Sequence, residues 1–461
     1  MIVRVATGAS LLALALTARP AVAEAKDTSW TLQEALGNPH GLKISASIRT
    51  RYEALHDQFR PGLDRNDDLV TIRTDVFAEY DGGPIRIGGE LVDARAYFGD
   101  QGSSISTGEV NALEPIQAYL GADFGPVLGK GSTTSVDAGR FVLDLGSRRL
   151  IARNDFPNTT TAFTGAKFEW RGAGKERLTL FYTYPQQRLP GDKASLLDNK
   201  AKLDREGTDL IFWGGFFNKP KIVGSTSLDV YFFALEESDR PTTATRDRHI
   251  FTPGFRVLRE PAAGKVDYQL EYAYQFGHIS TSTTPGAPRR DVSAHTLHAE
   301  LGYQFAGAWQ PRLAAFYDYG SGDGRGEKYT RFDGLFGSRT GDWGPGALYG
   351  PLGRSNISSP GFKLEAKPSK RLDGFVAYRA AWLANSHDSF ASTGVKDPGG
   401  ASGKFGGHQI WARGRYWLVP KMLRWEAGGA VLFDGRFLKN APNANRFGNT
   451  VYGYTDLTLT I

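Results

Sequence analysis

The chain has 461 residues, a net charge of +6, a mean hydropathy of −0.36 and no cysteine. The absence of cysteine excludes disulfides, thiolate metal sites and cysteine nucleophiles. The basic residues are scattered over predicted strands and no nucleic-acid-binding motif occurs, so binding to nucleic acid is not expected.

The first residues have the pattern of a secretory signal. Arg4 precedes a mostly apolar stretch at 6–16, which is too short to cross a bilayer as a helix. Ala21-Val22-Ala23 then supplies the small residues of a cleavage site. We predict a cleaved signal peptide at 1–23; a short N-terminal anchor is the alternative.

No later segment contains the 18 or more consecutive apolar residues that a spanning helix needs. Only helices and closed barrels can cross a membrane, because every backbone polar group needs a partner there. An exported chain of this kind is therefore either a soluble periplasmic or secreted protein, or a membrane β-barrel.

In chain order, a short helix is predicted at 28–36, ended by Gly37, and almost only strands follow. Residues 42–49, 268–276 and 297–305 alternate apolar and polar side chains, which places the two sets on opposite faces of a sheet. The polar set is heavily charged, and the apolar set ends in Tyr, Trp or Phe. This combination favours a polar lumen and a lipid-facing band with an aromatic girdle over a soluble sandwich.

The predicted connections alternate between short and long, as periplasmic turns and outer loops do in membrane barrels. Short turns at 81–84 and 172–175 contrast with long loops at 185–206 and 320–358. The strands are predicted to start near residues 42, 69, 85, 113, 134, 162, 177, 208, 227, 248, 266, 294, 311, 361, 372, 408, 423 and 450.

The sequence thus predicts an all-β fold, a transmembrane antiparallel β-barrel of about 18 strands. The last strand, ending at Ile461, would close the barrel against the first. We assign 1–23 to the signal peptide, 24–41 to a short periplasmic segment and 42–461 to a barrel in the outer membrane of a Gram-negative bacterium, in contact with outer-membrane lipid.

Several blocks of sequence carry a resemblance to a known family. They are Ala138-Gly139-Arg140, Leu145-Gly146-Ser147-Arg148-Arg149-Leu150-Ile151, Arg153-Asn154-Asp155, Thr164-Gly165, Tyr317-Asp318-Tyr319-Gly320-Ser321-Gly322-Asp323, Phe332-Asp333-Gly334-Leu335-Phe336 and Gly353-Arg354-Ser355-Asn356-Ile357. Together they resemble the alginate-export outer-membrane family over most of the chain. Phe141 is a departure, because the family tends to carry Gln there.

The resemblance implies a barrel that exports an anionic polysaccharide along a path lined by Arg and Lys with acidic counter-residues. It also makes a periplasmic scaffold protein a candidate partner. The alternatives are a general or substrate-specific porin for small solutes and, in another class, an outer-membrane enzyme that acts on lipid.

Lumen-facing cations are the candidate substrate path. We expect Arg73, Arg140, Arg379, Arg413 and Arg415 to face inward, because their neighbours of opposite parity are largely apolar and must face lipid. Arg49 and Lys167 lie on the same register. Rings of such residues select anions, although lumen charges also pair across strands and brace the wall. Asp137 has the opposite parity to Arg140, so only one of the two can face inward on a regular strand.

The long segment after Gly320 is the candidate gate. It combines many glycines with Phe332, Phe336, Trp343 and Tyr349, a mixture that is flexible and yet able to pack into a pore mouth. We predict that it folds over or into the extracellular end and narrows the path; a solvated surface loop is the alternative.

No motif of a hydrolase, metalloprotease or nucleotide-binding enzyme occurs, so an enzyme and a cofactor are not expected. His295 and His298 lie three apart on one predicted strand and therefore face opposite sides. Asp318 and Asp323 leave open a calcium site near the outer mouth, although the sequence gives no metal-binding motif.

Overall fold

The computed structural model describes residues 29–240 and 244–461, so the predicted signal peptide at 1–23 lies outside the described residues. The first element is helix α2 at Leu32–Ala35. It starts later than predicted because Thr31 caps it: the Thr31 hydroxyl accepts from the amide of Glu34, whose carboxylate accepts from the amide of Thr31. No helix in the described part of the chain is long and apolar enough to cross a membrane.

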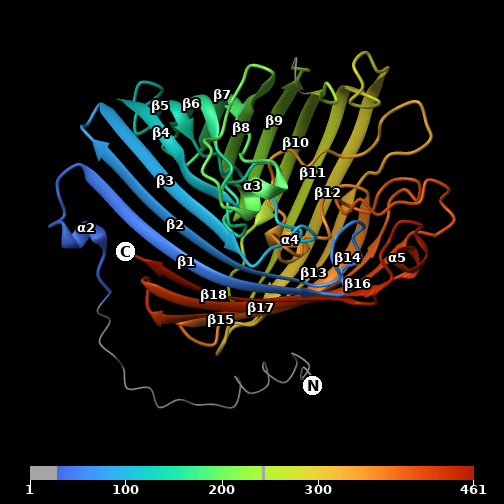
Figure 1. The fold of residues 1–461 in the computed structure, drawn as a ribbon. Coiled ribbons are helices and arrows are strands. Elements are labelled where there is room, and N and C mark those ends of the chain that lie inside the picture. Colours follow the sequence, from blue (N-terminus) through green and yellow to red (C-terminus); the bar gives the residue numbers. More distant parts are fainter. Residues whose placement is uncertain (1–28, 241–243) are drawn as a thin grey trace.

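The described residues contain one antiparallel sheet of 18 strands, as predicted. The strands are β1 Leu42–His56, β2 Asp67–Asp81, β3 Ile85–Tyr97, β4 Asn111–Gly125, β5 Thr133–Phe141, β6 Phe163–Arg171, β7 Arg177–Pro185, β8 Leu210–Val223, β9 Thr226–Glu237, β10 His249–Arg259, β11 Lys265–Ser280, β12 Arg289–Gln304, β13 Arg312–Gly320, β14 Ile357–Ala366, β15 Leu372–Trp382, β16 Phe405–Val419, β17 Leu423–Asp434 and β18 Thr450–Thr460. Each strand pairs with its neighbours in sequence, and β18 pairs with β1, so the sheet closes into a barrel (Figure 1).

Alternation along each strand sets the inner and outer faces. On β2, Arg73 and Asp75 are buried on one face, whereas Val76 and Tyr80 are exposed on the other. The register repeats this across the sheet, because directly paired residues share a face: Arg49 on β1 lies opposite Arg73. The barrel therefore has a charged interior here and an apolar exterior.

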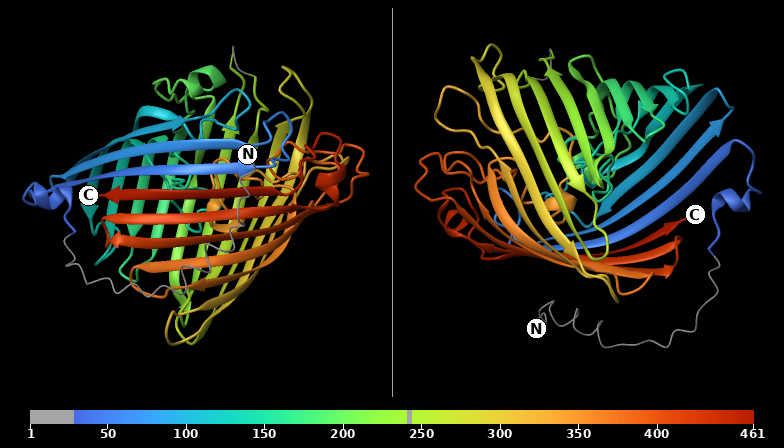
Figure 2. Two further views of the ribbon diagram at one scale, coloured as in Figure 1. Left: turned by 60° about the horizontal axis from the view of Figure 1, so that its bottom comes forward. Right: turned by 180° about the vertical axis from the view of Figure 1, so that it is seen from behind.

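The connections differ between the two ends of the barrel (Figure 2). At one end, where β1 begins and β18 ends, the turns are short; examples are 82–84 and 420–422. At the other end, which we call the loop end, the connections are long. They include 186–209, which contains helix α3 at Lys193–Leu197, and 435–449, which contains helix α5 at Arg436–Asn440.

Two long connections from the loop end fold inward instead of outward. We call residues 142–162 the first inner segment and residues 321–356, which contain helix α4 at Thr340–Trp343, the second inner segment. Helix α4 lies within the ring of strands in Figure 1. Apolar residues of both segments pack on inward-facing side chains of the wall and so form the two largest apolar clusters of the described chain.

Candidate functional site

The first inner segment is held by arginines on the inner face of β1. Arg49 donates to the carbonyl oxygens of Asp155 and Pro157 at 2.8 and 2.9 Å. Arg51 donates to the carbonyl oxygen of Phe156 at 2.8 Å and lies over its ring. These contacts fix the segment against the wall by charge-assisted hydrogen bonds.

The second inner segment carries the four aromatic residues of the predicted gate. Phe332, Trp343 and Tyr349 are at most 2% exposed, so a solvated surface loop does not describe them. Trp343 lies over the guanidinium of Arg379, 4.3 Å from it, and the Tyr349 hydroxyl donates to Gln409 at 2.9 Å. Both partners lie on inner faces of the wall, so this segment occupies part of the lumen.

The two inner segments are joined to each other. Ile151 and Phe336 form a parallel bridge, in which the amide of Phe336 donates to the carbonyl of Leu150 at 3.0 Å. Gly337 lies so close that an added Cβ would meet the carbonyl oxygen of Arg149 at 1.8 Å. Glycine at this position allows the two backbones to pack against each other, and the segments form one inner layer.

The carboxylate of Asp342, in the inner layer, forms ion pairs with two guanidinium groups. Arg149 donates from Nε and Nη2 to the two Asp342 carboxylate oxygens at 2.9 and 3.0 Å, and Arg354 donates to the same carboxylate. Arg379 donates to the main-chain carbonyl oxygen of Asp342. Burial alone would raise the pKa of Asp342, but the charges of Arg149 and Arg354 outweigh it and hold the pKa well below its ordinary value.

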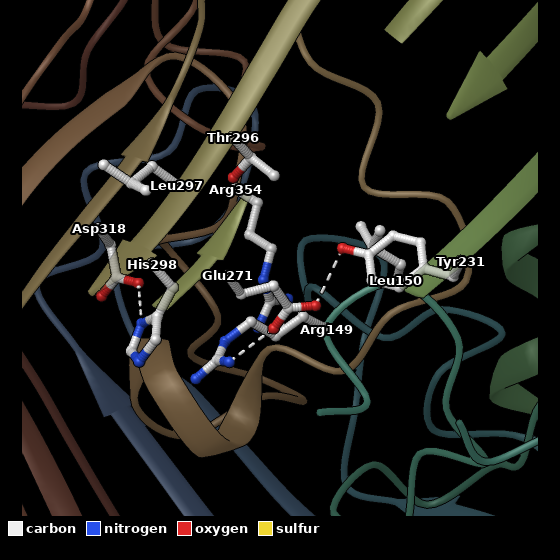
Figure 3. A pocket seen from close by; sticks show the side chains of 9 residues that line it. All are labelled: Arg149, Leu150, Tyr231, Glu271, Thr296, Leu297, His298, Asp318 and Arg354. Atoms are coloured by element: carbon white, nitrogen blue, oxygen red, sulfur yellow. Dashed lines mark hydrogen bonds and ion pairs between the residues drawn. The ribbon is translucent and has the colours of Figure 1, made fainter. Parts of the chain in front are cut away.

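A small cavity adjoins this cluster, with room for about one water molecule (Figure 3). Its lining includes Arg149, Arg354, Glu271 and His298, and Arg149 donates to Glu271 at 2.8 Å. His298 pairs through Nδ1 with Asp318 at 2.7 Å, while its buried Nε2 has no hydrogen-bond partner in the structure. The cavity is therefore polar and rich in charge.

The predicted path residues fall into distinct environments. Arg73 is buried and donates to Asp75 at 2.8 Å. Arg379 is also buried, held by Asp318 at 3.2 Å and covered by the second inner segment. Arg49, described above, binds carbonyl oxygens of the first inner segment. In this state these three arginines hold the inner layer or the wall.

Arg413 and Arg415 lie on the inner face of β16, nearer to its short-turn end, and their side chains are more exposed to solvent. Both bind the single carboxylate of Asp373, at 3.5 and 2.8 Å. Their side chains stay 28% and 32% exposed. Two cations sharing one anion leave an excess of positive charge on an accessible part of the lumen wall.

Lys167 on β6 and Arg140 on β5 are both held by carboxylates. Lys167 pairs with Asp137 at 3.1 Å, so Asp137 occupies the inner side of β5. Arg140 follows the other parity and is bound by Glu114 and, at 3.1 Å, by Glu206. Asp137 therefore shares the inner face of the wall with Lys167, and the inward placement of Arg140 stays a prediction.

Sequence reasoning missed an apolar inner surface on β6 to β9. Phe163, Phe181, Phe212 and Phe233 face inward there, and the rings of Phe163 and Phe212 contact Phe336 of the second inner segment. It also missed the roles of Arg149 and Arg354 as holders of Asp342. The only sequence signal for these arginines was their place in the family-like blocks, because they lie outside the alternating strands.

The described residues contain no group of three His, Cys, Asp or Glu that could hold a metal ion. Asp318 is paired with His298 and Arg379, and Asp323 is paired with Arg290 at 2.8 Å. His295 lies on the other face of β12 from His298, as predicted, and stacks on Tyr319.

Comparison with known families gives an assignment that agrees with this architecture. The family model for alginate export matches residues 41–451, which is nearly the whole chain. The chain belongs to the alginate export family. As a member of this family with a closed 18-stranded barrel, it is an outer-membrane channel protein of the Gram-negative cell envelope. No curated protein matches the chain.

Solved porin structures share the fold of this alginate export family member. Pseudomonas aeruginosa OccK8 (OprE) is similar with a TM-score of 0.57 at 12% identity, covering 91% of this chain and 98% of that one. Pseudomonas aeruginosa OpdQ has a TM-score of 0.54 at 14% identity, covering 91% and 97%. Pseudomonas aeruginosa OccK2 (OpdF), solved in complex with glucuronate, has a TM-score of 0.54 at 11% identity, covering 92% and 98%.

Proposed function

We propose that this channel passes an anionic polysaccharide, or a similar anionic solute, through its charged lumen. The observation that carries the proposal is the pair Arg413 and Arg415, which both bind Asp373 and remain partly exposed. The two residues are two positions apart on β16, so a polyanion could meet them in turn, about 7 Å apart. Guanidinium groups pair with carboxylates through two parallel hydrogen bonds, which suits uronate sugars.

Weak binding is as important as attraction for transport. A cation without counter-charge would trap a polyanion, whereas an acid beside it competes for the same guanidinium. Asp373 can act in this way for Arg413 and Arg415, and Asp137 and Glu169 can do so for Lys167. We infer a path on which each carboxylate of the solute is held briefly and passed on.

A second candidate function is uptake or release of small anionic solutes. The observation that favours it is the inner layer, which fills part of the lumen and is fixed to the wall by buried contacts. One structurally similar barrel was solved with glucuronate, a single uronate, which supports an anionic solute of this size as a candidate for this chain too. For this function, Arg413 and Arg415 select solutes of negative charge, and the inner layer limits the size of the solute that can pass.

Planar-bilayer recordings of the purified, folded protein test both functions. We expect conductance with a preference for anions, and we expect oligouronates to block the current in a manner that depends on chain length. Block by long oligouronates supports polymer passage, whereas block by monomeric uronate alone supports the small-solute channel. A preference for cations, or no conductance, would refute both readings.

A further inference from the structure

Arg149 and Arg354 bind the Asp342 carboxylate with the geometry of a carboxylate-binding site. Arg149 approaches with two donors side by side, and Arg354 adds a third from another part of the inner layer. Parallel donation of this kind is how arginine recognises planar carboxylates, including those of ligands. The carboxylate that fills the site belongs to the chain itself.

Asp342 lies on helix α4, which is short and contains or adjoins two glycines. Helix α4 has four residues, and its first residue lacks a side-chain cap. Gly344 ends the helix with a φ of 100°, and Gly341 has open space around its Cβ position. A four-residue helix with a glycine inside it and another at its C-terminus has little stability of its own, so its position depends mainly on the contacts of Asp342 and Trp343.

The arginine side of the site is more firmly supported. Arg149 also donates to Glu271 on the inner face of β11. The residue Arg354 lies three positions before β14, and its carbonyl oxygen packs closely against Gly320, the last residue of β13. The cavity lined by Arg149 and Arg354 lies directly beside them. If α4 moved away, the two guanidiniums would stay at the wall with space next to them.

Moving Asp342 away without a replacement would be strongly unfavourable. It would leave Arg354 without its ion pair and Arg149 with Glu271 as its ion-pair partner among the described residues, and uncompensated buried charge is costly. An incoming carboxylate removes this cost because it restores the ion pairs. A neutral sugar cannot do so.

We propose that Arg149 and Arg354 form a binding site for a uronate carboxylate, which Asp342 occupies in the closed state and which the transported solute takes over when helix α4 moves away. The inference rests on the proposed function and adds a binding site and a trigger to it. Because Asp342 is tethered beside the site, its effective concentration is in the millimolar range or above. Monomeric uronate should therefore compete only at millimolar concentrations.

Binding can be measured apart from transport. The chain has no cysteine, so Gly341→Cys introduces a single thiol next to Asp342 for an environment-sensitive fluorophore. With the labelled barrel in detergent, galacturonate should change the fluorescence with half-saturation at millimolar concentration, whereas the same concentration of galactose should leave it unchanged. The double variant Arg149→Gln with Arg354→Gln should lose the response.

The decisive variant is Asp342→Asn, which removes the internal competitor. It should lower the half-saturating galacturonate concentration at least tenfold and, in bilayers, raise the open probability without solute. The matched control is Asp333→Asn in the same segment: Asp333 pairs with Arg248 at 2.8 Å, and Arg248 keeps Glu237 as a partner. Asp333→Asn should behave like the parent, and heat-modified gel mobility confirms that each variant is folded.

The outcomes separate this inference from the proposed function. Unchanged or weaker galacturonate binding in Asp342→Asn, or an equal response of the parent to galactose, overturns the carboxylate site. If Asp342→Asn lost the heat-modified mobility, Asp342→Glu would decide: it keeps the carboxylate and should stay within about threefold of the parent, and a tenfold change would overturn the inference. A normal galacturonate response in a barrel that conducts no anions would refute the proposed function and leave the site standing.

Discussion

Reversing the charge of Arg413 and Arg415 should reduce or invert anion selectivity. Together with Asp373, these residues carry a net charge of +1, and the double variant Arg413→Glu with Arg415→Glu changes it to −3. An ion passing about 7 Å away in water feels about 0.6 kcal/mol from each charge. The double variant changes four charges, so the four energies add. Screening at 0.1 M salt reduces this total by roughly half, to about 1.2 kcal/mol, which corresponds to a roughly eightfold change in anion preference.

The assay is the reversal potential in a salt gradient, measured for the parent and the double variant under identical conditions. Lys370→Glu with Lys421→Glu is the matched control, because it makes the same change of net charge in exposed short turns at the same end of the barrel. The control should shift the reversal potential much less. An unchanged reversal potential in Arg413→Glu with Arg415→Glu would show that these arginines brace the wall and would remove the main support for an anion path.

Three further predictions concern the loops. Deleting residues 324–350 should raise the conductance in bilayers, because the second inner segment fills part of the lumen; an unchanged conductance in a folded deletion variant would rule out the gate. Gly337→Ala should also raise it, since the new methyl group would collide with the Arg149 carbonyl and separate the inner segments; parent-like traces would contradict this. Burial raises the pKa of Glu109 to about 7 from 4.5. The folded loop is therefore most stable below pH 4.5, and its free energy of unfolding falls by about 3 kcal/mol as the pH rises through 7. Protease cleavage within 98–110 should therefore be faster at pH 8 than at pH 5, and Glu109→Gln should abolish that difference.

Sequence alone predicted the wall well because the two faces of most strands differ in polarity. On β2, alternation placed Arg73 inside and Val76 outside, and the structure agrees. The rule has no force where both faces are apolar. On β8, Phe212 faces inward and its neighbour Trp213 faces outward, and no pattern of polarity distinguishes them.

The inner layer was predicted only in part, for a different physical reason. The mixture of glycine and aromatic residues after Gly320 indicated a segment able to pack into the mouth, but the first inner segment carries no such signal. Its position depends on long-range partners such as Arg49 and Arg51, whose contacts lie about a hundred residues away in sequence. Arg149 and Asp342 are 193 residues apart in sequence, so no local pattern could reveal their ion pair.

The most direct test of the central claim is the release of solutes from liposomes that contain the purified barrel. Oligouronates and neutral oligosaccharides of equal length should be loaded into the same vesicles and their release followed over time. An anion-selective path predicts faster release of the oligouronate, and the difference should shrink in Arg413→Glu with Arg415→Glu. Equal release of both solutes, or faster release of the neutral one, would contradict the account.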